Sequence, residues 1–116
     1  MINFDLKNRV AIVTGGAQGF GFAITKRFID SGASVIIWDI DEEEAKKALN
    51  KINSKSLSYQ VVDVSNSDAI NKSLSQVENS QGKIDIFINN AGITGMNATV
   101  EDYPIDEWNK VMHLNL

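Results

Sequence analysis

The sequence predicts an α/β fold built on a doubly wound parallel sheet, in a chain whose 116 residues suffice for one domain with a core. Short apolar runs rich in β-branched residues alternate with segments of helical periodicity. Strands separated by helix-length segments form parallel β-α-β units with right-handed crossovers. Polar residues follow three of the apolar runs. In such sheets ligands bind beyond the carboxyl ends of the strands, so a binding site is expected there.

Composition excludes several classes of protein and site. A hydrophobic content of 43% with 22% charged residues is an ordinary globular balance, and a formal net charge of -4 argues against nucleic acid or an anionic membrane as the main partner. The lack of cysteine excludes disulfides, a thiol nucleophile and a cysteine metal site. The start MINFDLKNR contains no signal-peptide segment and no run approaches a membrane span, so a cytoplasmic location is expected.

The first predicted strand, VAIV (Val10 to Val13), leads directly into TGGAQGFG (Thr14 to Gly21). Separated glycines between a strand and a helix suggest a phosphate site, because glycine admits close backbone approach and the first helical N–H groups can hold an anion. A P-loop would need lysine where Phe22 stands, and G-x-G-x-x-G would need a third glycine at Ile24. The remaining pattern is T-G-x-x-x-G-x-G.

The helix after this loop is expected to carry its apolar side chains at helical spacing and to end near a glycine. The expected apolar positions are Phe20, Ala23, Ile24 and Phe28, and the expected terminator is Gly32.

The second predicted strand, SVIIWD, runs from Ser34 to Asp39. Asp41 is expected to cap the next helix, whose first turn, Glu42 to Glu44, is acidic. Two i,i+4 ion pairs are expected on its solvated face, namely Glu42 with Lys46 and Glu43 with Lys47.

The third predicted strand, Leu57 to Val62, precedes a helix that Ser67 is expected to cap and Gly82 to end. Its apolar side would carry Ile70, Leu74 and Val77.

The fourth predicted strand runs from Ile84 to Ile88. A last helix is expected from about Ile105, after Pro104, with Trp108 and Met112 near one face. No capping signal follows it, so the sequence is expected to stop inside a helix.

Polar residues stand at the carboxyl ends of the second, third and fourth predicted strands: Asp39, Asp63, and Asn89 with Asn90. Asp39 follows Gly21 at close to the roughly 20 residues typical of an acid that holds the ribose hydroxyls of a dinucleotide.

These motifs resemble those of the short-chain dehydrogenase/reductase family in its non-extended branch. The matching motifs are TGGAQGFG, Asp39, DV at Asp63 and Val64, NNAG from Asn89 to Gly92, and the asparagine of HLNL, Asn115. The resemblance covers the whole chain but only the N-terminal half of the family's fold. It implies that residues 1–116 form a dinucleotide-binding, Rossmann-like domain with strand order 3-2-1-4, truncated after about four strands.

The resemblance also assigns roles to individual residues. Asp39 would hold the adenosine ribose, Asp63 the adenine edge, and Asn90 would lie along the cofactor ribose. Asn89 would tie adjacent strands together, and Asn115 would hold a water in the catalytic proton relay. Trp38 and Trp108 are expected in the core or the cleft wall, and His113 on a helix surface. The implied cofactor-binding residues are Gly15, Gln18, Gly19, Phe20, Gly21, Asp39, Ile40, Asp63, Val64, Asn90, Ala91 and Gly92, with no metal ligand.

The implied activity is hydride transfer between a nicotinamide cofactor and a small alcohol or carbonyl substrate. The family's catalysis uses a serine and a Tyr-x-x-x-Lys pair. Tyr59 and Tyr103 are followed four residues on by Asp63 and Glu107, so the chain alone is expected to be inactive.

NAD is expected over NADP, because a 2′-phosphate beside Asp39 would meet a like charge and Gln18 stands where phosphate-preferring relatives often carry a basic residue. The full-length form is expected to be a homo-oligomer. Two alternatives are a non-catalytic dinucleotide-binding module and a family member with epimerase or dehydratase chemistry. The latter fits less well, since extended members resemble T-G-x-x-G-x-x-G.

Overall fold

The computed structural model describes residues 5–90. Over that range strands and helices alternate, and each predicted strand overlaps an observed one. The elements are β1 (Val10–Thr14), α1 (Gly19–Asp30), β2 (Ser34–Asp39), α2 (Glu42–Ile52), β3 (Leu57–Val61), α3 (Ser67–Gln81) and β4 (Ile86–Asn89). The last predicted helix, with Trp108, Met112 and His113, lies outside the described residues.

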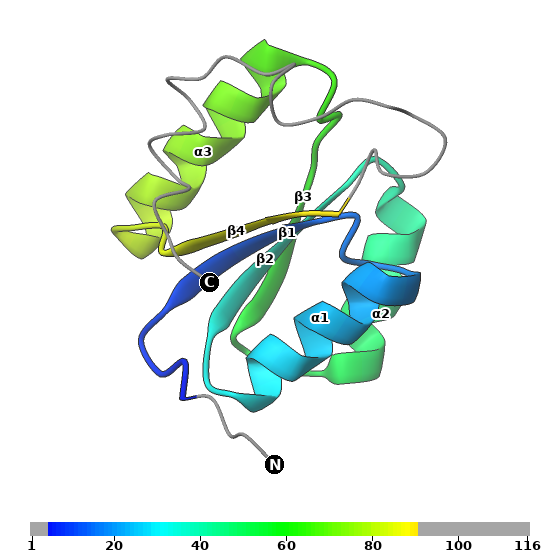
Figure 1. Ribbon diagram of the computed structural model, residues 1–116. Helices are drawn as coiled ribbons and strands as arrows, with labels where there is room; N and C mark the ends of the chain where they lie inside the picture. Colours follow the sequence, from blue (N-terminus) through cyan, green and yellow to red (C-terminus); the bar gives the residue numbers. More distant parts are fainter. Residues whose placement is uncertain (1–4, 91–116) are drawn as a thin grey trace.

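The strands form one parallel sheet in the order β3-β2-β1-β4, as predicted. Helices α1 and α2 cover one face of this sheet and α3 covers the other (Figure 1). The carboxyl ends of all four strands therefore lie along one edge, where the chain passes from strand to loop.

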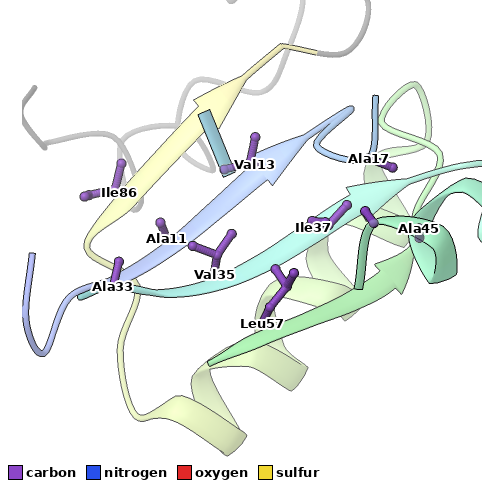
Figure 2. Close-up of a cluster of buried hydrophobic side chains, with 10 residues drawn as sticks. Ala11, Val13, Ala17, Ala33, Val35, Ile37, Ala45, Leu57 and Ile86 are labelled. Carbon is purple, nitrogen blue, oxygen red and sulfur yellow. The ribbon is translucent and has the colours of Figure 1, made fainter. Parts of the chain in front are cut away.

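Each face of the sheet has its own apolar core. On the face covered by α1 and α2, buried side chains come from strands, helices and loops, with Ala11 and Val13 on β1 beside Val35 and Ile37 on β2 (Figure 2). On the α3 face, Ile70, Leu74 and Val77 are buried, as predicted. The α3-face core also holds Trp38, which is fully buried and packs edge to face on Phe87 with ring centroids 5.4 Å apart.

Helix ends follow the sequence signals, with one correction. Asp41 caps α2 by accepting a 3.2 Å hydrogen bond from the Glu44 amide, as predicted. The predicted cap Ser67 is wrong: it is the first helical residue, and Asn66 accepts from the Ala69 amide at 3.1 Å. Asn66 has the extended backbone that a capping residue needs, and its side chain reaches the free N–H groups of the first turn.

The buried face of α1 agrees with the prediction at Ile24 and Phe28, which pack partly buried against the core, and differs at the other two positions. Phe20 is 75% exposed and Ala23 is exposed, whereas Gly21 and Thr25 are buried. The small residues face the loop and the sheet because α1 begins in close contact with the loop that precedes it, where a large side chain has no space.

Neither predicted ion pair of α2 occurs among the side-chain contacts of residues 5–90. Lys47 pairs with Glu44 at 3.2 Å instead, and Glu42 accepts a 2.7 Å hydrogen bond from the Tyr59 hydroxyl on β3. Glu42 therefore contacts Tyr59 on the neighbouring strand and not Lys46 in its own helix.

Candidate functional site

The glycine loop is anchored to the neighbouring strand by its first residue. Gly15 has a φ of 62° and Gly19 a φ of 55°, both in the left-handed region that favours glycine. The Gly15 amide donates a 2.7 Å hydrogen bond to the Trp38 carbonyl at the end of β2. The loop therefore turns sharply at both ends while it stays attached to the sheet.

Gly21 is required by the close approach of α1 to this loop. A Cβ at position 21 would overlap with the Gly15 carbonyl oxygen and lie 2.7 Å from Nδ2 of Asn90. Asn90 Nδ2 in turn donates to the Gly15 carbonyl at 3.3 Å. The structure thus brings together three of the predicted site residues, from the loop, α1 and the end of β4.

The N-terminus of α1 differs from those of α2 and α3. Its capping residue, Gln18, makes no side-chain capping hydrogen bond, and its first turn contains no acid. Within residues 5–90, the amides of Gly19, Phe20 and Gly21 have no protein acceptor. By contrast, α2 and α3 have side-chain caps and acidic first turns. Free N–H groups at the positive end of a helix dipole form an anion site.

Asp39 stands beside the glycine loop at the end of β2. Its Oδ2 accepts from the Ala17 amide at 3.4 Å, and its Oδ1 accepts from the Asp41 amide at 3.0 Å. The residue is half-buried. This places a negative charge close to the glycine loop.

Asp63 lies in the turn after β3 and is exposed. Its Oδ1 accepts from the Ser65 hydroxyl at 2.6 Å and from the Ser65 amide at 2.9 Å. These two hydrogen bonds, the hydroxyl's foremost, hold the pKa of the Asp63 carboxyl below its ordinary value. The preceding Val62 amide donates to the Asp39 carbonyl at 3.2 Å, so the turn begins next to Asp39.

Three predicted apolar site residues lie at the ends of these elements. Phe20 is 75% exposed and Ile40 is 68% exposed. Val64 is partly buried against the α3-face core. Phe20 and Ile40 are therefore available to cover a ligand, whereas Val64 also has a packing role.

Thr14 connects β1 to the end of β4. Its buried hydroxyl donates to Asn89 Oδ1 at 3.1 Å and accepts from the Asn90 amide at 2.8 Å. The predicted role of Asn89 in tying adjacent strands together is thus confirmed. The same contacts fix the position of Asn90 relative to the loop.

Thr25 is a site residue that the sequence analysis missed. It is fully buried on α1. Its hydroxyl donates to the Gly21 carbonyl at 2.9 Å and to the Gly16 carbonyl at 3.3 Å. A Cβ at Gly16 would come within 2.9 Å of that hydroxyl. The available signal was a hydroxyl residue one helical turn after Gly21, on the face toward the loop.

The Tyr59 hydroxyl is engaged by Glu42 on α2. The hydrogen bond that its hydroxyl donates to Glu42 raises its pKa above the ordinary value, and the charge of Glu42 adds to this effect. The predicted site residues Ala91, Gly92 and Asn115, together with Tyr103, lie outside the described residues.

Residues 5–90 include no group of three or more acidic, histidine or cysteine side chains that could hold a metal ion. In the same part of the chain, no helix combines the length and the apolar character that crossing a membrane requires.

The family model for short chain dehydrogenase matches residues 9–116, which is most of the chain. The chain belongs to the short-chain dehydrogenase family. Within the family, one curated relative is the 3-oxoacyl-[acyl-carrier-protein] reductase FabG of Chlamydia muridarum, with 39% identity over 99% of this chain and 47% of that protein. Another is the 3alpha-hydroxysteroid dehydrogenase of Mediterraneibacter gnavus, with 35% identity over 96% of this chain and 46% of that protein. The chain thus spans about half the length of these relatives.

Solved short-chain dehydrogenase structures share the fold. A 3-ketoacyl-(acyl-carrier-protein) reductase from Brucella melitensis complexed with NADH matches with a TM-score of 0.73 and 30% identity, over 92% of this chain and 43% of that chain. An NAD+-bound xylitol dehydrogenase matches with a TM-score of 0.72 and 31% identity, over 91% of this chain and 42% of that chain. The Rossmann-like sheet is thus common to this chain and its structural neighbours.

Proposed function

We propose that this chain is the cofactor-binding part of an NAD-dependent oxidoreductase that transfers hydride between nicotinamide and an alcohol or carbonyl substrate. One observation carries the proposal: the uncapped N-terminus of α1 lies against the glycine loop, next to the carboxylate of Asp39. An anion site and a fixed acid, side by side at the carboxyl ends of parallel strands, suit the pyrophosphate and ribose of a dinucleotide.

The chain's own groups would bind the cofactor in three places. The amides of Gly19, Phe20 and Gly21 would donate to the pyrophosphate, and the first turn of α1 contains no acid that would repel it. Asp39 would accept from the ribose hydroxyls. Exposed Ile40 and the Asp63 turn would receive the adenine, with the Asp63 carboxylate as an acceptor.

The preference for NAD follows from charge. A 2′-phosphate beside the Asp39 carboxylate would meet a like charge, which costs roughly 1 kcal/mol at about 4 Å in water and about 4 kcal/mol at a surface-like dielectric. The expected preference for NAD is about tenfold to a thousandfold. Gln18, exposed beside the loop, adds no positive charge that would offset this repulsion.

The bound nicotinamide would supply the hydride chemistry, and the protein orients it. Proton transfer in this family uses a Tyr-x-x-x-Lys pair, and neither Tyr59 nor Tyr103 is followed by a lysine four residues on. We therefore expect the chain alone to show no turnover, and we assign Asn115 to the water of the proton relay in the complete enzyme.

A second candidate is a non-catalytic module that binds the dinucleotide. The sequence feature that favours it is the lack of a Tyr-x-x-x-Lys pair within the 116 residues. The two candidates differ in one measurement, which is turnover of secondary alcohols with NAD by the complete gene product.

The binding site can be tested by calorimetric titration of NADH and of NADPH into the chain. We expect tighter binding of NADH, and we expect Asp39→Asn to reduce the NADH preference at least several-fold. Asp30→Asn is a matched control, because it removes the same charge from an exposed position whose ion pair within residues 5–90 is with Lys26 in the same helix. Equal affinities for the two cofactors in the parent chain would contradict the proposed preference.

A further inference from the structure

The indole of Trp38 depends on one hydrogen-bond acceptor. The side chain is fully buried, and its Nε1–H donates to Oε1 of Gln60 at 2.7 Å. The two residues are direct neighbours across β2 and β3. A buried indole N–H without a partner is costly, so the Gln60 amide determines which orientation of the ring is stable.

The Gln60 amide is itself held in one orientation by α3. Its Nε2 donates to Oε1 of Gln76 at 2.8 Å and to the Ser73 carbonyl at 3.4 Å. The amide must therefore present its oxygen to Trp38 and its nitrogen to the helix. A continuous chain of hydrogen bonds therefore runs from Gln76 on α3 through Gln60 to the buried Trp38 ring.

The opposite side of the ring is also fixed, by the edge-to-face contact with Phe87 on β4. The orientation of Trp38 is thus set from β3 and from β4. Its main chain is part of the candidate cofactor site, because the Trp38 carbonyl accepts from the Gly15 amide at 2.7 Å. The next residue is Asp39, whose contact with the Ala17 amide is already long at 3.4 Å.

We propose that Gln60 is a positioning residue for the cofactor site, acting through Trp38 on the glycine loop and on the Asp39 carboxylate. The inference rests on the proposed binding of a nicotinamide dinucleotide. In this proposal, losing the Gln60 acceptor displaces the indole and shifts the Trp38 main chain, which carries the carbonyl bonded to Gly15 and continues into Asp39. The first property to change would be the discrimination between a ribose hydroxyl and a 2′-phosphate, because this depends on the distance of one carboxylate.

The decisive variant is Gln60→Met, which keeps the length of the side chain and removes the amide. The Gln60 side chain also lines an open groove of about 510 Å³ along the β3 edge, so a side chain of similar size has space. We expect the ratio of the NADPH to the NADH dissociation constant to fall about threefold to tenfold. Gln60→Glu keeps an acceptor for the indole but loses the donor to the Ser73 carbonyl, so it is expected to retain more of the ratio than Gln60→Met does. Gln81→Met, an exposed change at the end of α3, is the matched control and should leave the ratio unchanged.

The NMR chemical shift of the Trp38 indole N–H, assigned by its disappearance in Trp38→Phe, gives a second measurement that a change in stability alone does not alter. It should shift upfield in Gln60→Met and stay close to the parent position in Gln60→Glu. If Gln60→Met does not fold, Trp38→Phe removes the same hydrogen bond from its other end and should lower the ratio in the same direction.

A Gln60→Met chain that is less stable but keeps the parent ratio would overturn the positioning role and leave Gln60 a structural residue. A parent chain that binds neither cofactor would overturn the proposed function, and this inference with it. The two failures are distinguishable, because the first is seen in the Gln60→Met variant and the second in the parent chain.

Discussion

The carbonyl oxygen of Gly15 lies in the space that a Cβ at residue 21 would occupy. The contact joins the start of the glycine loop to the first turn of α1. It explains why the loop needs glycine at position 21 for a steric reason, although Gly21 does not have a positive φ.

We predict that Gly21→Ala separates α1 from the loop. The added methyl group must displace backbone, which costs roughly 1–3 kcal/mol of unfolding free energy, and NADH affinity should fall at least about tenfold. Urea denaturation and calorimetric titration measure the two effects. Gly82→Ala is the control, because Gly82 has a φ of 85° and open space around it, so it should lose stability without losing affinity. Unchanged NADH binding by Gly21→Ala would show that the close approach is not needed.

Thr25→Val tests the buried hydroxyl that contacts the loop. Valine has nearly the same shape but cannot donate to the Gly21 and Gly16 carbonyls. We expect a loss of about 1–2 kcal/mol in unfolding free energy, measured as a lower urea midpoint at constant slope. Thr25→Ser keeps the hydroxyl and should lose less. The assignment is wrong if serine proves as destabilising as valine.

The pKa of Asp63 should respond to Ser65. Because the Ser65 hydroxyl and amide lower this pKa in the folded chain, we expect the carboxyl of the Ser65→Ala variant to titrate at a higher pH than in the parent. The lowered folded pKa means that the contribution of Asp63 to stability is present above the unfolded pKa of about 3.9 and is lost as pH falls through the folded pKa. A side-chain NMR titration of both proteins checks the direction. Identical titration curves would contradict it.

Asp85 should contribute to acid sensitivity on the opposite edge of the sheet. Burial acts to raise its pKa, but the Val10 amide at 2.8 Å, Lys83 at 3.1 Å and Arg9 at 3.8 Å outweigh burial and lower the pKa. The stabilisation is present above the unfolded pKa of about 3.9 and is lost as pH falls through the folded value. Asp85→Asn should therefore cost about 1–2 kcal/mol at pH 7 and much less near pH 2. Denaturation at both pH values tests this, and an equal loss at each would refute the ionic role.

Local signals were sufficient for most of the architecture. The apolar runs predicted the strands, Asp41 predicted a helix start and Gly82 a helix end, since each depends on residues within one or two turns. The same reasoning was wrong at Ser67, where two adjacent capping residues competed and Asn66 had the required backbone. The strand order followed from the resemblance and agrees with the structure.

The sequence by itself determined the alternation of strands and helices, the glycine loop and the acid at the end of β2, because these are encoded by residue type and spacing. Only the tertiary structure decided which face of α1 is buried and how Trp38 is held. The Gln60 acceptor, the Phe87 ring and the Thr25 contacts with Gly16 depend on side-chain placement after packing. Spacing along a chain constrains which residues can meet. Packing then selects the partners, because each buried polar group needs one acceptor or donor within about 3 Å.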